Sequence, residues 1–398
     1  MTLRLAILVS HPIQHFAPWH REVAKLKEVD LRVFFYSDLG VNEFFDPEFQ
    51  AKFSWDIPLL DGYGHEFLPI RQRPKQLAFW EVDNPTVGEA LDRFAPDVVK
   101  VFGYAHRTTW RVAKWASVRR KPLLLYSDSN DRARPPIWKQ ILKRPIVSRF
   151  YSHVDGALFV GNNNFAYHRR YGLPPERLFR GSLPIDQAQL LSLVPNRSEV
   201  RRDIRLKYDI PQDAFVVMFC GKYSARKRPV DVIAAAHMTK SKGIPAWSLM
   251  VGEGSERASM EEYCRVHNVT NTTLTGFVNQ TQIAEHYVAS DVIVVSSEND
   301  PHPLVVSEAA TFGLPALVSD QIGCIGNEDT ARPGVSAVVY PCGNREQLAA
   351  LIEAIYHDSD RYRQLSLGAS EISVTQDVTA AARDLALAAQ QLLELGPR

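Results

Sequence analysis

Short apolar runs alternate with longer, partly polar segments along the first half of the chain. Apolar runs are typical of buried parallel strands, and apolar residues recurring every three or four positions are typical of amphipathic helices. The predicted strands cover residues 3–9, 31–36, 97–102, 122–126 and 156–160. The predicted helices cover residues 16–26, 84–94, 108–117, 133–148 and 162–171. Residues 38–73 interrupt this alternation with a long, irregular and aromatic-rich segment. The strand–helix units predict a parallel sheet with helices on both faces.

A second alternating series follows a polar segment. Residues 183–213 contain three prolines and a charged run, which indicates an interdomain linker and a lead-in helix. The predicted strands cover residues 215–220, 247–251, 269–275, 291–295, 315–318 and 336–339. The predicted helices cover residues 229–239, 256–267, 281–289, 303–312, 345–357 and 378–395. We therefore predict an α/β protein with two Rossmann-like, doubly wound parallel-sheet domains, at 1–185 and 186–375.

The composition is ordinary for a globular protein, but the charge is unevenly distributed along the chain. The 398 residues are too many for one core, and their net charge is +1. Residues 101–180, however, hold 16 Lys and Arg against 4 Asp and Glu, which predicts a local basic face. The four cysteines form no Cys-x-x-Cys pair, which favours buried free thiols and a cytoplasmic protein. We interpret the apolar N-terminal run as a first strand rather than a signal peptide, and no apolar stretch is long enough to span a membrane.

The basic region also contains apolar residues at helical spacing. Ile137, Trp138, Ile141 and Leu142 recur in this way beside cations. One interpretation is a helix that makes a peripheral contact with an anionic membrane, at its inner face. The other is a stripe that faces the core and leaves a solvated basic back. No recognised nucleic-acid-binding fold accompanies the charge, so nucleic acid is not an expected partner.

The segment at residues 296–310 carries the clearest chemical signal. It follows a predicted buried strand, and Pro303 is suited to the first position of a helix because its missing N–H costs nothing there. The N–H groups of Leu304 and Val305 would then point out of the helix start. The helix dipole favours an anion at this position, so the segment predicts an anion-binding site.

Two carboxylates bracket this predicted anion site. Asp300 is also explained as an ordinary acid at a helix start. Glu308 is harder to explain in that way, because it falls in the middle of the helix among apolar residues. A carboxylate there needs a partner or a ligand hydroxyl. The pattern suggests a site for a sugar attached to a phosphate.

A basic loop follows the predicted strand at residues 215–220. Lys222 and Lys227 belong to this loop, at the carboxyl end of the strand, where doubly wound sheets bind ligands. The loop lacks the glycines of a phosphate loop, so its lysines would neutralise a diphosphate by charge. A solvated basic loop is the alternative.

Two glycine turns follow the next strands of this half. Gly252 would let the backbone approach a phosphate or a ribose. Gly276, Phe277 and Val278 would offer main-chain groups to a base. Each turn alone is weak evidence, because glycine is common in tight turns.

Polar residues in the first half fall at predicted strand ends. These residues are His11, Gln14, His106 and Asp128, and each is also explained as a structural turn residue. No spacing suggests a metal site, and no Gly-x-Ser-x-Gly nucleophile motif is present.

These loops, taken together and in order, resemble a known family. Residues 221–228, 251–254, 276–278 and 296–308, followed by 313–318, are similar to the retaining glycosyltransferases of family 4, the group 1 or glycogen synthase-like family. The likeness covers residues 215–358, and residues 10–18 also resemble a subgroup of that family.

The resemblance implies a GT-B fold, in which two Rossmann-like domains face each other across a cleft. The first domain would bind the acceptor, the second would bind the donor, and the helix at about 376–398 would pack back on the first. The implied activity is that of a hexosyltransferase, which moves a sugar from a nucleotide-sugar co-substrate, most often a UDP-sugar, with retention of anomeric configuration. No metal or other cofactor is required in the family. The acceptor would be a glycan, a lipid-linked saccharide or a small molecule such as a natural product.

The family pattern also assigns roles to individual residues. Glu308 would hold the nucleotide ribose, and Asp300 stands where the family has a glutamate that contacts the donor sugar. Lys227 matches the family lysine, and Lys222 replaces an arginine, which loses bidentate phosphate contacts. His106 would lie near the donor sugar, so Asp300, Lys227 and His106 are the implied catalytic residues. His11, Gln14 and Asp128 would lie on the acceptor side.

One departure from the family lies between the two acids. Pro301 and Pro303 replace residues with N–H groups, so fewer backbone donors remain for the sugar and the diphosphate. Two alternatives to a transferase therefore stay open. The chain could be a catalytically weak subunit that binds a sugar nucleotide or glycan, or a sugar-nucleotide epimerase of the same fold.

Overall fold

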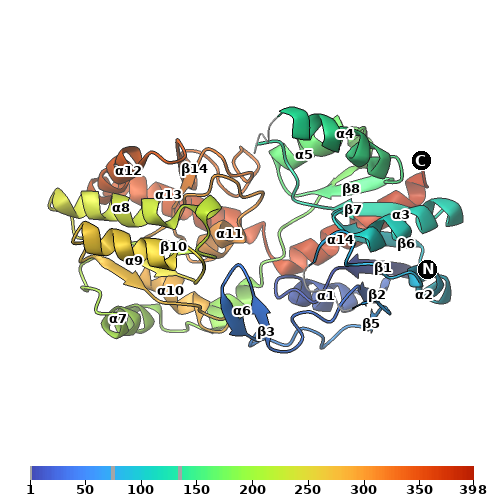
Figure 1. Cartoon of the computed structure of the whole chain (residues 1–398), viewed down its shortest axis with the longest axis horizontal. Coiled ribbons are helices and arrows are strands. Elements are labelled where there is room, and N and C mark those ends of the chain that lie inside the picture. Colours follow the sequence, from blue (N-terminus) through green and yellow to red (C-terminus); the bar gives the residue numbers. More distant parts are fainter. Residues whose placement is uncertain (1, 73–76, 133–136) are drawn as a thin grey trace. The chain divides into compact units, whose positions relative to one another are not determined.

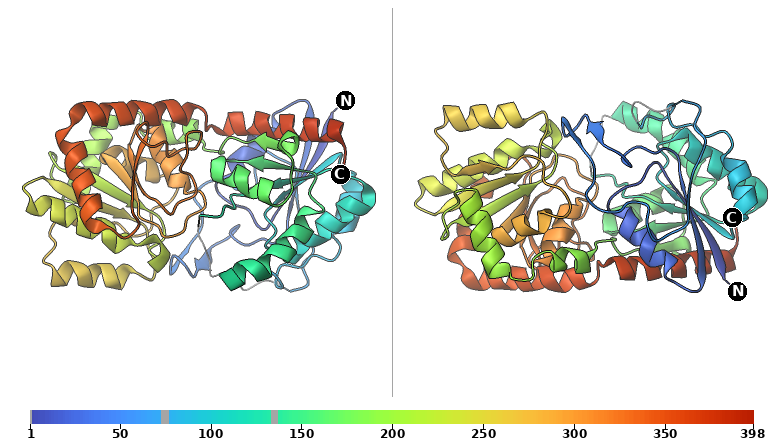
Figure 2. Two further views of the ribbon diagram at one scale, coloured as in Figure 1. Left: turned by 90° about the horizontal axis from the view of Figure 1, so that it is seen from above. Right: turned by 90° about the horizontal axis from the view of Figure 1, so that it is seen from below.

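The computed structural model describes residues 2–72, 77–132 and 137–398. It divides into two compact units. Unit 1 contains residues 1–42, 58–184 and 377–398, and unit 2 contains residues 43–57 and 185–376. Each unit has a parallel sheet with helices on both faces (Figures 1 and 2).

The described part of unit 1 has a seven-stranded sheet in the order β5-β2-β1-β6-β7-β8-β9, and every neighbouring pair is parallel. Its strands are β1 (Leu3–Val9), β2 (Val29–Phe35), β5 (His65–Phe67), β6 (Val98–Phe102), β7 (Leu123–Tyr126), β8 (Gly156–Phe159) and β9 (Leu178–Arg180). Its helices are α1 (Phe16–Ala24), α2 (Val87–Phe94), α3 (Arg107–Arg119), α4 (Ile137–Tyr151), α5 (Asn162–Arg170) and α14 (Val378–Leu395). The strand order reverses between β1 and β6, so ligands are expected at the carboxyl ends of these strands.

The C-terminal helix α14 belongs to unit 1, where it packs against α1. Two side-chain contacts hold it on the unit. Asp384 accepts a hydrogen bond from the Ser182 hydroxyl at 2.7 Å, and Arg177 donates to the carbonyl of Gly396 at 2.8 Å.

A buried lysine lies in the sheet of unit 1. The side chain of Lys100 on β6 is inaccessible to solvent, and its Nζ atom lies 3.7 Å from the centroid of the Trp19 ring. Nζ has no hydrogen-bond partner among the described residues. Burial holds the pKa of Lys100 well below its ordinary value, since the charged form loses its hydration.

Unit 2 has a six-stranded parallel sheet across its described residues, in the order β12-β11-β10-β13-β14-β15. Its strands are β10 (Phe215–Cys220), β11 (Ala246–Val251), β12 (Thr272–Leu274), β13 (Val292–Val295), β14 (Ala316–Ser319) and β15 (Ala337–Tyr340). Its helices are α6 (Gln187–Ser192), α7 (Arg197–Lys207), α8 (Pro229–Ser241), α9 (Arg257–Val266), α10 (Ile283–Ala289), α11 (Leu304–Thr311), α12 (Arg345–His357) and α13 (Ser359–Val374). The order reverses between β10 and β13, which brings the loops after these strands together.

A small antiparallel hairpin also belongs to unit 2, although it comes from the first part of the chain. It consists of β3 (Phe44–Asp46) and β4 (Ala51–Phe53). We refer to residues 43–57 as the hairpin segment. The sequence placed this segment in the first domain, whereas in the structure it clusters with residues 185–376. Its aromatic and acidic side chains account for this position, because they contact the glycine turn and the basic loop described below.

Three further differences from the predicted elements have simple physical reasons. The irregular segment at 38–73 contains β3, β4 and β5, which have three residues each and are too short to show a period. Helix α4 begins at Ile137 and continues to Tyr151, and the predicted helical residues 133–136 lie outside the described residues. Pro303 is the N-cap of α11 rather than its first helical residue.

Candidate functional site

The carboxyl edge of the sheet in unit 2 gathers the loops that the sequence singled out. Gly252, after β11, has a φ angle of +142°, and its N–H donates to the carbonyl of Gly276 at 3.0 Å. A Cβ atom on Gly252 would lie 2.0 Å from the carbonyl oxygen of Gly221. Only glycine therefore fits at position 252, and it holds the backbones of three neighbouring loops close together.

The basic loop after β10 and the acidic loop after β13 meet in an ion pair. The Nζ atom of Lys227 lies 3.0 Å from a carboxylate oxygen of Asp300, and both side chains are mostly buried. The Ser296 hydroxyl donates to the carbonyl of Lys227 at 2.7 Å, which fixes the two loops against each other. The structure thus brings together two of the three residues that the family pattern implies are catalytic.

Lys222 makes ion pairs with the hairpin segment. Its Nζ atom lies 2.7 Å from a carboxylate oxygen of Glu48 and 3.1 Å from one of Asp46. The same atom lies 4.9 Å from the centroid of the Phe49 ring. Two carboxylates therefore already neutralise the lysine that the sequence assigned to a diphosphate.

Glu308 projects from the middle of α11 into a buried position. The Tyr287 hydroxyl donates to its Oε2 atom at 2.6 Å, so the carboxylate has the partner that its burial requires. Burial raises the pKa of Glu308 above its ordinary value, and the hydrogen bond from Tyr287 opposes this shift. The negative charge of Glu308 also helps to raise the pKa of Cys220, after burial, to about 12. Glu308 therefore faces the end of β10, behind the basic loop.

Aromatic side chains of the hairpin segment cover the glycine turn after β12. The Phe277 ring stacks on Phe53 with a centroid distance of 4.2 Å and an interplanar angle of 23°. The Phe49 and Trp55 rings lie 5.2 Å and 6.2 Å from Phe277. Asn279 donates to the carbonyl of Ser54 at 2.8 Å. Gly276, Phe277 and Val278 are half-buried.

No pattern in the sequence indicated that Asp46, Glu48 and Phe53 belong to this site. The segment was noted for its length and aromatic content, but neither property names a partner 170 residues away or more. His302 lies between the two prolines that depart from the family pattern. Its imidazole is buried beside Asp300, and burial lowers the pKa of His302 to about 4, so this side chain is neutral at pH 7.

The candidate residues of unit 1 follow β1, β6 and β7 at the carboxyl edge of their own sheet. His11 forms a hydrogen bond with the Ser10 hydroxyl at 2.9 Å, and Gln14 forms one with His15 at 3.1 Å. Asp128 is half-buried after β7. All three remain predictions for the acceptor side.

His106 is the N-cap of α3 and lies just after β6. Its ring stands edge-on to Tyr36, with a centroid distance of 6.0 Å. Its Nδ1 atom is buried and lacks a hydrogen-bond partner within the described ranges. Burial lowers the pKa of His106, so the imidazole is neutral at pH 7. Its proposed catalytic role stays a prediction.

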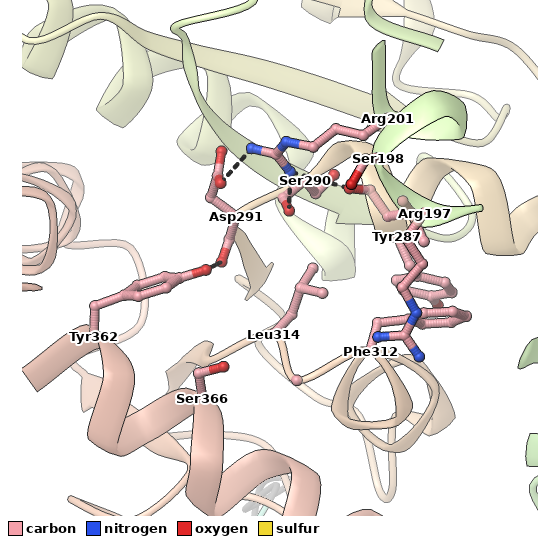
Figure 3. Close-up of a pocket in the computed structure, with 12 residues that line it drawn as sticks. Arg197, Ser198, Arg201, Tyr287, Ser290, Asp291, Phe312, Leu314, Tyr362 and Ser366 are labelled. Carbon is pink, nitrogen blue, oxygen red and sulfur yellow. Dashed lines mark hydrogen bonds and ion pairs between the residues drawn. The ribbon is translucent and has the colours of Figure 1, made fainter. Parts of the chain in front are cut away.

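A pocket of about 310 Å³ lies at the opposite edge of the sheet in unit 2 (Figure 3). Its wall includes Asp291 and Leu314, which precede β13 and β14. Asp291 forms an ion pair with Arg201 at 2.6 Å and accepts a hydrogen bond from the Tyr362 hydroxyl on its backbone carbonyl at 3.2 Å. The lining thus contains one ion pair, and it also includes Tyr287, whose hydroxyl donates to Glu308.

No group of three or more His, Cys, Asp or Glu side chains in the described part of the chain could hold a metal ion. Among the described helices, none is both long and apolar enough to cross a membrane. The four cysteines are free thiols.

The two doubly wound sheets define a fold, which comparison with solved structures identifies as the GT-B fold. A structure of Anabaena HepE in complex with UDP and glucose matches with a TM-score of 0.70 and 15% identity, over 97% of this chain and 98% of that one. A glycosyltransferase from Rickettsia africae matches with a TM-score of 0.72 and 14% identity, over 99% of both chains. At these identities the likeness shows the fold alone, and it confirms the predicted GT-B fold.

Sequence comparison finds relatives for the second half of the chain. Residues 200–371 match the family model described as glycosyl transferases group 1. The D-inositol 3-phosphate glycosyltransferase of Thermomonospora curvata is 29% identical over 216 residues, or 50% of this chain and 48% of that protein. The lipopolysaccharide core biosynthesis glycosyltransferase LpsE of Rhizobium meliloti is 28% identical over 173 residues, or 43% and 48%. The chain spans about half the length of the curated relatives that it matches. The second half of the chain is therefore similar to the group 1 glycosyltransferases, as its loops predicted.

Proposed function

We propose that this protein transfers a sugar from a nucleoside diphosphate sugar to an acceptor hydroxyl, with retention of configuration and without a metal. The observation that carries this proposal is the ion pair between Lys227 and Asp300 at the carboxyl edge of unit 2. The pair supports the proposal because a cation suited to a diphosphate lies beside a carboxylate suited to sugar hydroxyls. Glu308, on the helix α11 that follows Asp300, would accept hydrogen bonds from the ribose.

In this reaction the cationic groups would have the main catalytic role. The bond between the anomeric carbon and the phosphate oxygen breaks, and the leaving diphosphate gains negative charge. Lys227, Lys222 and the N–H groups at the start of α11 would stabilise that charge where it develops. The acceptor oxygen forms the new bond to the anomeric carbon, and its proton passes to a phosphate oxygen of the donor. This route follows the family resemblance and needs no general base from the protein.

Relatives support a nucleotide-sugar donor and a range of acceptors. HepE has been solved with UDP and with UDP-glucose, which favours a UDP-sugar, whereas one sequence relative from Mycobacterium tuberculosis is a GDP-mannose-dependent mannosyltransferase. LpsE is named for lipopolysaccharide core biosynthesis, which favours a glycan or lipid-linked acceptor. The relatives named as D-inositol 3-phosphate glycosyltransferases favour a small, polar acceptor.

A thermal-shift screen against UDP, GDP and ADP would identify the base. Release of nucleoside diphosphate from the matching labelled sugar donor would then establish transferase chemistry. The shift should disappear in Glu308→Ala and persist in the control Glu262→Ala, whose side chain is exposed on helix α9. An unchanged shift in Glu308→Ala would refute the site assignment.

A second candidate function is a catalytically weak sugar-nucleotide-binding subunit. The ion pairs of Lys222 with Asp46 and Glu48 favour it, because a diphosphate would have to replace two carboxylates. Nucleotide binding without release of nucleoside diphosphate, across all acceptor classes, would support this candidate over the transferase.

A further inference from the structure

The pocket in Figure 3 lies at the amino edge of the sheet in unit 2, where β13 and β14 begin, and we call it the amino-edge pocket. Three of its lining side chains donate no hydrogen bond to any other described residue. They are Arg197 and Ser198 at the start of α7 and Ser366 on α13. Donors from two separate helices therefore border one pocket and are available to a ligand.

The amino-edge pocket also carries a net positive charge. Asp291 is the one acid in its lining across the described ranges. Nη2 of Arg201 lies 2.6 Å and Nη2 of Arg205 lies 3.0 Å from its carboxylate oxygens, and a backbone N–H donates to the same carboxylate at 2.7 Å. These three side chains together carry one positive charge, and Arg197 adds a second. Asp291 is thus fully paired, and the excess positive charge is available to an anion.

The size and charge of the pocket indicate the class of ligand. Its volume of about 310 Å³ is at the lower end of the range of about 300 to 1,000 Å³ that is typical of small-molecule sites. A phosphomonoester has a charge of about −1.5 to −2 at pH 7 and three acceptor oxygens, whereas a carboxylate has a single charge and a neutral sugar has none. Two positive charges and a planar guanidinium group therefore favour the phosphomonoester. The hydroxyls of Ser198 and Ser366 suit a short polyol attached to the phosphate.

A series of side-chain contacts connects the amino-edge pocket to Glu308. The Arg197 guanidinium lies 5.5 Å from the centroid of the Phe312 ring. The Phe312 ring stacks on Tyr287, with a centroid distance of 5.7 Å and an interplanar angle of 13°. Tyr287 lines the pocket, and its hydroxyl donates to Glu308 at 2.6 Å. A ligand that holds Arg197 would therefore also fix the aromatic pair that orients Glu308.

We propose that the amino-edge pocket is an effector site for a small phosphomonoester of a polyol, and that its occupancy strengthens nucleotide binding through Tyr287. The phosphate is held by Arg197, and the polyol is held by the serine hydroxyls. Ordering of Arg197 and its aromatic neighbours holds Glu308 in place, so less ordering remains to be done when the ribose binds. The phosphomonoester site stands on the pocket alone, whereas the coupling rests on the proposed function.

The site is tested by isothermal calorimetry of the full chain in phosphate-free buffer, with glycerol 3-phosphate and inorganic phosphate as probes. Glycerol 3-phosphate should bind more tightly, and Ser198→Ala/Ser366→Ala should remove this preference. Arg197→Gln should weaken binding of both probes by about tenfold, because a charged hydrogen-bond donor is lost. Arg202→Gln is the matched control, since Arg202 is 58% exposed on the same helix and does not line the pocket.

Lys227→Ala separates this pocket from the candidate donor site, and it should leave the affinity for glycerol 3-phosphate unchanged. Equal affinity for the two probes would overturn the assignment of a phosphomonoester. Binding that survives Arg197→Gln, or that falls equally in Arg202→Gln, would overturn the site. Circular dichroism checks that each variant is folded.

The coupling is tested by measuring the Kd of the nucleoside diphosphate with and without saturating glycerol 3-phosphate. The effector should lower this Kd by about fivefold or more, and the nucleotide should lower the Kd of glycerol 3-phosphate by the same factor. Tyr287→Phe should abolish both effects while glycerol 3-phosphate still binds. A nucleotide Kd that does not respond to the effector would refute the coupling. Absence of nucleotide binding under both conditions would instead refute the proposed function, and the phosphate titrations would still decide the site.

Discussion

The Nζ atom of Lys222 lies 2.7 Å from a carboxylate oxygen of Glu48, a residue 174 positions earlier in the chain. Asp46 adds a second carboxylate at 3.1 Å. A lysine that would bind a diphosphate therefore holds two negative groups of the protein itself. The hairpin segment and a donor would compete for the same cation.

Removing these carboxylates should strengthen binding of a nucleoside diphosphate. The pair of Lys222 with Glu48 is exposed and the pair with Asp46 is partly buried. Each such pair contributes on the order of 1 kcal/mol, so Asp46→Asn/Glu48→Gln should lower the Kd by roughly 3- to 10-fold. Isothermal calorimetry with the diphosphate found in the nucleotide screen measures the change. Glu43→Gln, at the start of the same segment, is the control. Weaker binding in the double variant would mean that the two acids support the site.

Lys227 should matter more for turnover than for binding. Its ammonium group would stabilise charge that develops on the leaving diphosphate, and loss of such a group typically costs about 10² or more in kcat. We therefore expect Lys227→Ala to lower kcat by about this factor, with a smaller change in donor Kd. Arg226→Ala, at an exposed position of the same loop, should change neither by more than a few-fold. Equal losses in kcat and affinity for Lys227→Ala would contradict a role confined to the transition state.

Glu308 should make stability depend on pH. Because burial raises the pKa of Glu308, its carboxyl holds a proton to higher pH in the folded than in the unfolded chain. The resulting stability is present below the unfolded pKa of about 4.5 and is lost as pH rises through the folded pKa. Glu308→Gln keeps an acceptor for Tyr287 and should become more stable relative to wild type between about pH 4 and about pH 7. Thermal unfolding at both pH values measures this, with Glu298→Gln as the exposed control.

Lys100 should also make stability depend on pH, in the opposite direction from Glu308. Burial lowers the pKa of Lys100, so the unfolded chain binds the proton more strongly and stability falls as pH drops below the ordinary lysine pKa of about 10.4. Lys100→Met is close in volume and should raise the Tm at pH 7 and flatten its rise towards about pH 10. Lys114→Met, on the exposed side of α3, should change neither the Tm at pH 7 nor its dependence on pH. A less stable Lys100→Met at every pH would show that contact with Trp19 outweighs the cost of burial.

The sequence predicted the sheets well because long apolar runs such as residues 3–9 and 215–220 are buried on both faces. It also predicted the carboxyl edge of unit 2, since Gly252, Lys227 and Asp300 each follow a strand. It could not predict the partner of Lys222, because Asp46 and Glu48 lie in strands of three residues that show no period. It could not decide which side of α4 faces the core either, because both sides of that helix are apolar.

The hairpin segment affects how this chain can be dissected. A fragment of residues 185–376 has continuous sequence and includes the whole family match, yet it lacks Phe53 and the acids that neutralise Lys222. Such a fragment would present a bare Phe277 ring and an unpaired ammonium group to solvent. Nucleotide affinities measured on this fragment would describe a site that lacks the hairpin segment. A peptide of residues 43–57 added to the fragment should restore the cap, and the two pieces together form the complete folding unit.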